Sequence, residues 1–235
     1  MQRVGTGSRV ISRKREIERL RDWRIEIGSW RLYANFQSLI SNIQFPKMIA
    51  QPIEPTTEHL ITGEELLRMG DIGKCELVAG KIIRFDFNTI PHSIGVSKIA
   101  GALDDFVRPR RIGCVMIGGV GIYTRRNPDT VRGADVLFIS NERRARLSSE
   151  GYLDVAPELV VEVMSPDDRW SEIHRKLQEY FSIGVRLIWV ADPESRAVSA
   201  YRSMTDVREF GEDDALPGDD VLPGFSVPVA SSFEE

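Results

Sequence analysis

The stretch that most constrains this fold is ELVVEVMSPDDRW, residues 158–170. Its first seven residues are mostly apolar at both odd and even positions, which indicates a β-strand covered on both faces. Residues 170–183 then place Ile173 and Leu177 on one helical face, and Gly184 ends the helix. A strand with two apolar faces needs a layer of helices on each side of its sheet. The sequence therefore predicts an α/β (α+β) domain in which helices flank a mixed β-sheet.

The remaining pattern supplies further elements of this sheet. Thr62 and Glu65 fit a capping box, which predicts the start of a short helix. Apolar residues at helical spacing predict a longer helix over residues 92–107, and Pro109 is expected to stop it. Apolar runs bounded by turn residues predict strands at residues 76–78, 81–87, 114–123, 133–140, 186–192 and 197–203.

Charge is unevenly distributed along the chain. Residues 1–47 carry ten Lys/Arg against four Asp/Glu, whereas residues 48–235 carry 21 against 31. We therefore expect a basic, poorly ordered N-terminal extension, residues 1–47, followed by one acidic domain over residues 48–235. A basic extension can hold nucleic acid through phosphate contacts, although a solvated segment explains the same composition.

The cellular compartment is constrained by what the sequence lacks. No run reaches the eighteen apolar residues of a membrane span, and the basic N-terminus is not followed by the apolar core of a signal peptide. We therefore expect a cytoplasmic protein without membrane contact. Cys75 and Cys114 are too few for a disulfide framework and lack metal-ligand spacing, so both are expected to be reduced thiols.

Two carboxylates lie in apolar strands, where an unpaired charge would cost several kcal/mol to desolvate. Alternation puts Glu162 on the same covered face as Val160 and Met164, and Asp135 shares its face with Leu137. If the two strands are neighbours, the acids converge at one sheet edge, where a divalent cation would relieve their repulsion. Oxygen ligands suit Mg²⁺ or Mn²⁺ rather than zinc, and such sites serve phosphoryl chemistry.

A positive side chain is needed to stabilise the charge that develops on phosphate oxygens. Lys176 is the candidate, because it lies to one side of the apolar stripe formed by Ile173 and Leu177. Its stem could pack against the domain while its ammonium reaches the sheet. A surface lysine with a partly packed stem would have the same position in the sequence.

The ordered motifs resemble those of a known family. Glu76 in CELVAGKI, His92 at a helix start, Asp135 in a short strand and Glu162 in LVVEVMSP are followed by Lys176 and Tyr180 in one helix, then by GVRLIWVADP and LPGF. This order is similar to that of the Uma-two family of the PD-(D/E)XK restriction-endonuclease-like superfamily. The resemblance covers residues 58–235. It implies a mixed sheet flanked by helices and a metal-dependent nuclease site.

The resemblance also assigns roles residue by residue. It implies that Asp135, which the pattern places at the head of its strand, and Glu162 are metal ligands. Met164 stands where the superfamily places a lysine, so Lys176 of the next helix is implied to replace it. Glu76 would add a further metal or water contact, and a solvated acid at a helix end is the alternative.

The other candidate residues are expected to have mainly structural roles. His92 is expected to cap or pack its helix, with a site role as the alternative, and Tyr180 is expected to belong to the core. Asp192 and the acids of the two Pro-Asp pairs are expected to form turns. The glycines of IGGVGIY lack a following helix and a Gly-Lys-Ser/Thr motif, so they are expected to permit strand bending or close approach rather than phosphate binding.

Three functions are compatible with the sequence. The first is a Mg²⁺-dependent DNA endonuclease in which Asp135, Glu162, Lys176 and Glu76 form the catalytic site, with DNA as partner and a homodimer suited to double-strand cutting. The second is a nucleic-acid- or partner-binding module that keeps the fold without cleavage. The third is hydrolysis of a small phosphate ester. Arginine clusters at residues 108–111, 125–126 and 143–146 could contact phosphates or could be solvated loops.

Overall fold

The computed structural model describes residues 59–148 and 151–234, so the expected N-terminal extension lies outside the described residues. It is a mixed α+β structure with a mostly antiparallel sheet flanked by helices, as predicted. The elements in chain order are α3 (Gly63–Arg68), β1 (Cys75–Val78), β2 (Lys81–Arg84), α4 (Ile90–Arg110), β3 (Gly113–Arg125), β4 (Thr130–Ser140), α5 (Asn141–Arg144), β5 (Leu159–Val163), α6 (Trp170–Ile183), β6 (Leu187–Asp192), β7 (Ala197–Ser203), β8 (Asp206–Phe210), β9 (Ala215–Pro217), β10 (Ser226–Pro228) and the 3₁₀ helix η1 (Val229–Ser232).

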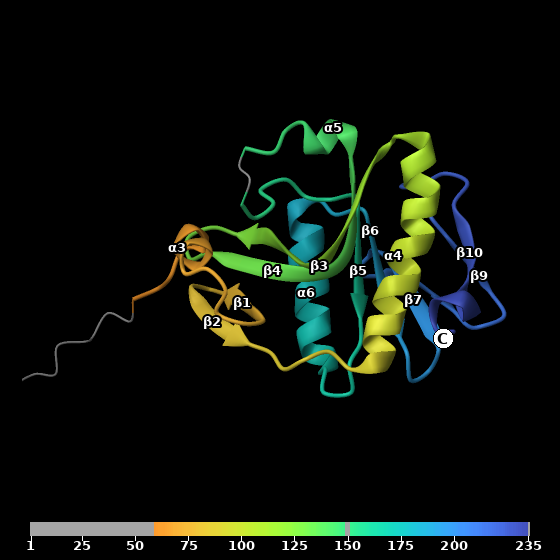
Figure 1. Ribbon diagram of the computed structural model, residues 1–235, viewed down its shortest axis with the longest axis horizontal. Helices are drawn as coiled ribbons and strands as arrows, with labels where there is room; N and C mark the ends of the chain where they lie inside the picture. The colour runs from red at the N-terminus through yellow and green to blue at the C-terminus, as the bar shows by residue number, and fades with distance from the viewer. Residues whose placement is uncertain (1–58, 149–150, 235) are drawn as a thin grey trace, which may run out of the picture. The chain divides into compact units, whose positions relative to one another are not determined.

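The main sheet has eight strands in the order β2-β1-β4-β5-β6-β7-β8, with β3 also paired to β4. Within it β5 and β6 form a parallel pair, and their other pairings are antiparallel. A parallel pair needs a crossover connection, which here is α6. Helices α4 and α6 lie on opposite sides of β5 and β6 (Figure 1).

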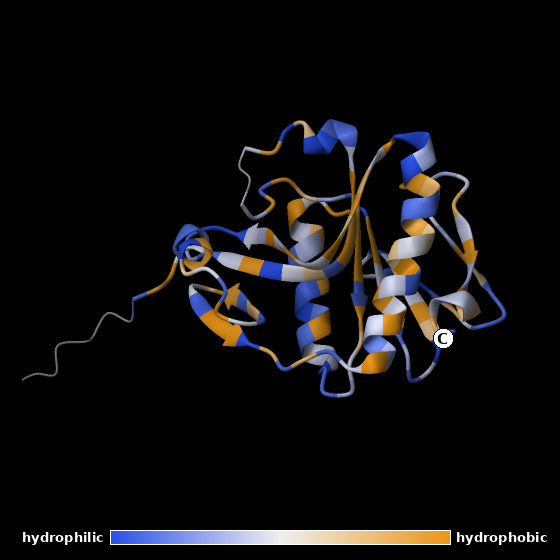
Figure 2. Ribbon diagram, viewed as in Figure 1, coloured by the Kyte–Doolittle hydropathy of each residue, from blue (hydrophilic) through white to orange (hydrophobic). Residues whose placement is uncertain are grey.

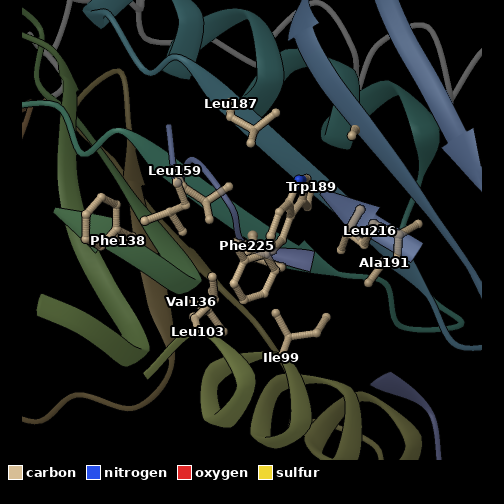
Figure 3. Close-up of a cluster of buried hydrophobic side chains, with 14 of the residues drawn as sticks. Ile99, Leu103, Val136, Phe138, Leu159, Leu187, Trp189, Ala191, Leu216 and Phe225 are labelled. Carbon is tan, nitrogen blue, oxygen red and sulfur yellow. The ribbon is translucent and has the colours of Figure 1, made fainter. Parts of the chain in front are cut away.

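Two hydrophobic clusters fill the space between the sheet and these helices. On the α4 side, Leu103 packs with Val136, Trp189 and Phe225, as Figure 3 shows. On the α6 side, Leu177 and its neighbours pack against residues of the opposite sheet face. Strand β5 is buried at all five positions because it lies between the two clusters, and the hydrophobic colour along the central strands in Figure 2 reflects this. The two-sided burial predicted from its valines is confirmed.

The helices confirm most of the predicted boundaries. The capping box of Thr62 and Glu65 is present at α3, and α6 spans residues 170–183 and ends at Gly184 in the left-handed region. The predicted end of the longer helix is wrong, because α4 continues through Pro109 to Arg110. Proline removes only one amide donor in this last turn, where the helix ends anyway.

Other differences lie toward strand ends and the C-terminus. Strand β2 ends at Arg84 and not at Phe87. The short elements α5, β8, β9, β10 and η1 were not predicted, yet Leu216 of β9 and Phe225 belong to the core on the α4 side. Within the described residues, no helix combines the length and apolarity required to cross a membrane.

The arrangement around β4 positions the candidate site. Strand β3 pairs with β4 along one edge from Thr130 to Ser140. A strand has two edges, so β1 and β5 must share the other. β1 pairs there at Val131, and β5 pairs from Val136 onward. Residues 132–135 therefore lie in a gap between two partner strands.

Asp135 lies inside this gap, which corrects its predicted place at the head of a strand. A bulge in β3 accompanies it, because Ile117 pairs with Val136 and Val120 pairs with Ala134. Gly118 and Gly119 have positive φ values of 97° and 72°, which glycine adopts without a Cβ clash. The prediction that these glycines permit strand bending is confirmed.

Candidate active site at the gap along β4

Two carboxylates replace ladder hydrogen bonds in the gap along β4. Glu76 of β1 accepts the N–H of Gly133 at 3.0 Å. Asp135 accepts the N–H of Val163, at the end of β5, at 2.9 Å. The backbone groups are thereby satisfied although the strands have separated, as buried amides require. The gap thus holds acidic side chains inside a sheet rather than at its outer edge.

Glu162 points from β5 toward α6, and both of its oxygens have partners there. Lys176 Nζ lies 2.9 Å from Oε2, and the Tyr180 hydroxyl donates to Oε1 at 2.7 Å. Burial, followed by the nearby charges of Asp135 and Glu76, raises the pKa of Glu162 to about 7, even though Lys176 opposes the shift. A carboxyl with this pKa exchanges its proton near neutral pH.

Lys176 joins two strands through its ammonium group. Besides Glu162, its Nζ lies 3.0 Å from Glu76 Oε1. Burial alone would lower the pKa of Lys176, but these two carboxylates raise it above its ordinary value, so the group is an ammonium ion. Met164 is half-buried and packs against the cluster on the α6 side. Lys176 of α6 thus approaches Glu162, whereas the position two residues after Glu162 holds Met164 and not a lysine.

Asp135 forms a hydrogen bond with a histidine of α4, which lies on the side of the sheet opposite α6. His92 is buried in the first turn of α4, and its Nε2 lies 3.2 Å from Asp135 Oδ2. Burial would raise the pKa of Asp135, but the hydrogen bonds from His92 and the Val163 amide outweigh it and lower the pKa. Thr89 fixes this turn by capping it, since its hydroxyl accepts the His92 amide. His92 therefore contacts the site and does more than cap or pack the helix.

Arg132 and Glu179 complete the network and were missed in the sequence. The Arg132 guanidinium donates to both oxygens of Glu179, at 2.6 and 2.8 Å, and to Glu76 Oε2 at 2.8 Å. Burial would lower the pKa of Arg132, but the two acids raise it. The signal available was an arginine between valine and glycine inside an apolar strand, where a cation needs a buried partner.

The structure also places the remaining candidates. Glu76 is buried in β1, so its interpretation as a solvated acid is wrong. Burial would raise its pKa, but Lys176 and Arg132 outweigh this and lower it. Tyr180 is fully buried, as expected, although its hydroxyl belongs to the site. Asp192 accepts hydrogen bonds from two residues of the following turn, as predicted.

The arginine clusters are partly engaged within the domain. Arg108 pairs with Asp104, and Arg126 pairs with Glu64 and Asp129. Arg143 pairs with Glu158 and donates to carbonyl oxygens. At least one cation of each cluster thus has an intramolecular role. Neither of the two interpretations, phosphate contact or solvated loop, describes the clusters fully.

The oxygen donors at the gap suit Mg²⁺ or Mn²⁺ better than zinc. Among the described residues around the gap, Glu76, Asp135, Glu162 and Glu179 lie near the two cations Lys176 and Arg132, so negative charge is in excess when all four acids are ionised. Within the described residues, both hydrogen bonds to the Asp135 carboxylate use Oδ2, so Oδ1 could take another ligand. In the part of the chain that the structure describes, no three His, Cys, Asp or Glu side chains converge to enclose a metal ion. A cation that binds through one or two carboxylates and keeps several waters fits this arrangement.

Comparisons with known proteins agree with the fold. The family model Uma2, described as "Putative restriction endonuclease", matches residues 64–230. A crystal structure of "a putative nuclease belonging to DUF820" from Anabaena variabilis ATCC 29413 is similar, with a TM-score of 0.63 and 21% sequence identity. The alignment covers 74% of this chain and 97% of that chain. A search of curated proteins finds no match. The matched range includes every acid and cation of the gap.

Proposed function

The chain belongs to the Uma2 family of restriction-endonuclease-like proteins, and from this premise we propose that it is a metal-dependent endonuclease that hydrolyses DNA phosphodiester bonds. The observation that carries the proposal is the convergence of Asp135, Glu162 and Lys176 from three different elements. Asp135 comes from the gap in β4, Glu162 from the end of β5 and Lys176 from α6. Two acids and one cation at the end of a strand pair suit in-line attack on a phosphate.

In this proposal Asp135 and Glu162 hold Mg²⁺ or Mn²⁺. The ion, when bound, polarises a phosphate oxygen and lowers the pKa of a coordinated water. Asp135 is kept ionised by His92 and the Val163 amide, so it is ready to bind a cation without losing a proton first. Glu162 must release its proton, because its pKa lies near 7 in the absence of a cation. Binding should therefore tighten as the pH rises through 7.

Lys176 acts as an electrostatic stabiliser in this proposal. Its raised pKa keeps it protonated, so it cannot abstract a proton from water in this state. An ammonium ion held by two carboxylates can orient the attacking water and offset charge on the phosphate oxygens. Glu76 keeps the ammonium in place, and Tyr180 fixes the orientation of Glu162. Both act on the site through other residues.

A second candidate, a binding module without cleavage, is supported by one observation. Both oxygens of Glu162 already have hydrogen-bond partners, in Lys176 and Tyr180. Such a closed network could be a stable end state that takes no cation. The fold alone does not decide between a nuclease and a binding module.

The decisive experiment is incubation of the full chain with plasmid and linear DNA in Mg²⁺, in Mn²⁺ or in EDTA. We expect cleavage with either cation and none in EDTA. Glu162→Gln and Lys176→Met should each abolish cleavage. Glu158→Gln is the matched control, because Glu158 is also buried but pairs with Arg143 outside the site. Metal-dependent cleavage that survives both site substitutions would sink the proposed site.

A further inference from the structure

The two oxygens of the Asp135 carboxylate have different surroundings. Oδ2 accepts the Val163 amide at 2.9 Å and lies 3.2 Å from His92 Nε2. An ionised carboxylate only accepts hydrogen bonds, so Nε2 is the ring nitrogen that carries the hydrogen of this contact. A carboxylate oxygen has two lone pairs, and these two donors use both lone pairs of Oδ2. Asp135 therefore offers a cation Oδ1 alone.

The polar interaction of the His92 ring is this one contact. Its other nitrogen, Nδ1, is buried and has no hydrogen-bond partner among the described residues. A buried polar atom without a partner lowers stability, so an apolar side chain would serve better if the position needed only packing. The donation from Nε2 to Asp135 is thus what accounts for a histidine in the first turn of α4.

The start of α4 lies close against the end of β5. Thr89 caps the helix and Pro91 lies in its first turn, which sets the position of His92. Gly95 follows three residues later on the same face, and an added Cβ there would lie 3.2 Å from Val163 Cγ1. Glycine is less favourable than alanine inside a helix. The missing Cβ lets the helix approach Val163, whose amide is the second donor to Oδ2.

Glu162 is not restricted to one oxygen in the same way. Among the described residues, Tyr180 donates to its Oε1 and Lys176 donates to its Oε2, so each oxygen keeps a lone pair. The restriction belongs to Asp135. One of its two donors is a backbone amide, so His92 is the side chain that imposes it.

We propose that His92 is a positioning residue that makes Asp135 a one-oxygen ligand and thereby favours Mg²⁺ over Ca²⁺ at the site. The inference rests on the proposed function, since it takes the site to bind a divalent cation. Ca²⁺ accepts a large, flexible shell of oxygens and often takes both oxygens of one carboxylate. Mg²⁺ requires a regular octahedron and keeps several waters. A single oxygen with a fixed direction suits Mg²⁺, whereas a carboxylate released from His92 could turn and bind Ca²⁺ through both oxygens.

The test measures binding of Mg²⁺ and of Ca²⁺ to the full chain at pH 8 by calorimetry, without DNA. His92→Leu removes the donor and should lower the ratio of Mg²⁺ to Ca²⁺ affinity roughly tenfold, an effect typical of residues that orient a metal ligand. His92→Gln keeps an N–H donor at the end of the side chain and should retain the wild-type ratio. A merely structural role would weaken both ions equally and leave the ratio unchanged.

A second pair of variants changes the seat of the helix and keeps the histidine. Gly95→Ala presses on Val163 and should lower the affinity ratio in the same direction as His92→Leu. Gly101→Ala is the matched control within α4, because an added Cβ there meets no atom within 4 Å. This control should leave the ratio unchanged.

Several outcomes would overturn the inference. These are an unchanged ratio in His92→Leu, an equal fall in His92→Leu and His92→Gln, or equal ratios in Gly95→Ala and Gly101→Ala. A wild-type chain that binds cations with the expected shifts but never cleaves DNA would end only the nuclease proposal. Metal-dependent cleavage together with an unchanged ratio in His92→Leu would end only this inference. A wild-type chain that binds neither ion would end both.

Discussion

The ammonium of Lys176 lies 2.9 Å from Glu162 Oε2, although helix α6 and strand β5 hold the two side chains. The strand itself offers no cation, since Met164 packs into the core two residues after Glu162. Lys176 of α6 thus supplies the cation beside Glu162, which β5 itself does not supply. The buried carboxylates of β1 and β5 share this ammonium group, and Glu76 of β1 also pairs with Arg132.

Lys176→Met should destabilise the protein more at high pH than at low pH. Removing the ammonium leaves Glu162 and Glu76 as buried acids, and breaking such a pair costs about 3–5 kcal/mol. At pH 5 Glu162 is protonated, so the loss should be smaller than at pH 8. Urea unfolding at both pH values measures the difference, with the exposed Lys98→Met on α4 as control. An equal loss at the two pH values would show that Glu162 carries no charge that Lys176 must balance.

In the wild-type protein in EDTA, the free energy of unfolding should fall as the pH rises from about 5 to about 8. The Glu162 carboxyl titrates near 4.5 in the unfolded chain but near 7 when folded. Over this interval the folded state holds the extra proton, so raising the pH favours unfolding, by at most ~3 kcal/mol. Glu76 and Asp135 have lowered pKa values, so their contribution is lost only at more acidic pH.

The matched variants for this pH series are Glu162→Gln, which should flatten the slope, and Glu158→Gln, which should retain it. Urea titrations at several pH values give the free energies. A wild-type profile that rises across this interval would contradict the raised pKa of Glu162.

Tyr180→Phe should cost about 1.5–3 kcal/mol, because it removes a hydrogen bond to a buried carboxyl without opening a cavity. Its hydroxyl donates to Glu162 Oε1 at 2.7 Å. Tyr152→Phe is the control, since Tyr152 packs edge-to-face on Tyr123 through its ring. Thermal and urea unfolding of the two variants should differ. Similar small losses in both would mean that Glu162 does not need the Tyr180 hydroxyl.

Arg132 and Glu179 should show a measurable coupling free energy. A double-mutant cycle with Arg132→Met and Glu179→Gln is expected to give ~1–3 kcal/mol, because contacting groups in one buried network are not independent. The exposed pair Arg202 and Asp206 provides the comparison and should give less than about 1 kcal/mol. Equal coupling free energies in the two pairs would show that the Arg132–Glu179 pair is no stronger than an exposed ion pair.

The sequence predicted the elements whose pattern is local. The valines of β5 and the helix ending at Gly184 appear where the periodicity places them, because burial on both faces and a glycine cap leave direct traces in the sequence. The short strands β9 and β10 leave no such trace. Leu216 of β9 belongs to the core and Val227 of β10 packs against it, and these contacts depend on the rest of the fold.

Of the acids around the gap, Glu76, Asp135 and Glu162 were candidates and Glu179 was not, and the geometry of the gap was not predicted. Glu162 and Lys176 were expected to meet, and they do. The gap along β4 could not be predicted, because it depends on how β1 and β5 share one strand edge. Arg132 was missed for the same reason, since its partners Glu76 and Glu179 lie on elements distant in sequence. The bulge of β3 opposite Asp135 likewise depends on how β3 and β4 pair.

Calorimetric titration of the full chain with Mn²⁺ or Mg²⁺ at pH 8 tests the central claim most directly. The account predicts binding that disappears in Asp135→Asn and Glu162→Gln, persists in Glu158→Gln and weakens below pH 7 as Glu162 takes up its proton. Undetectable binding by the wild-type chain, together with greater stability of Asp135→Ala or Glu162→Ala, would contradict it. Relief of buried charge repulsion raises stability only when no cation normally offsets that repulsion.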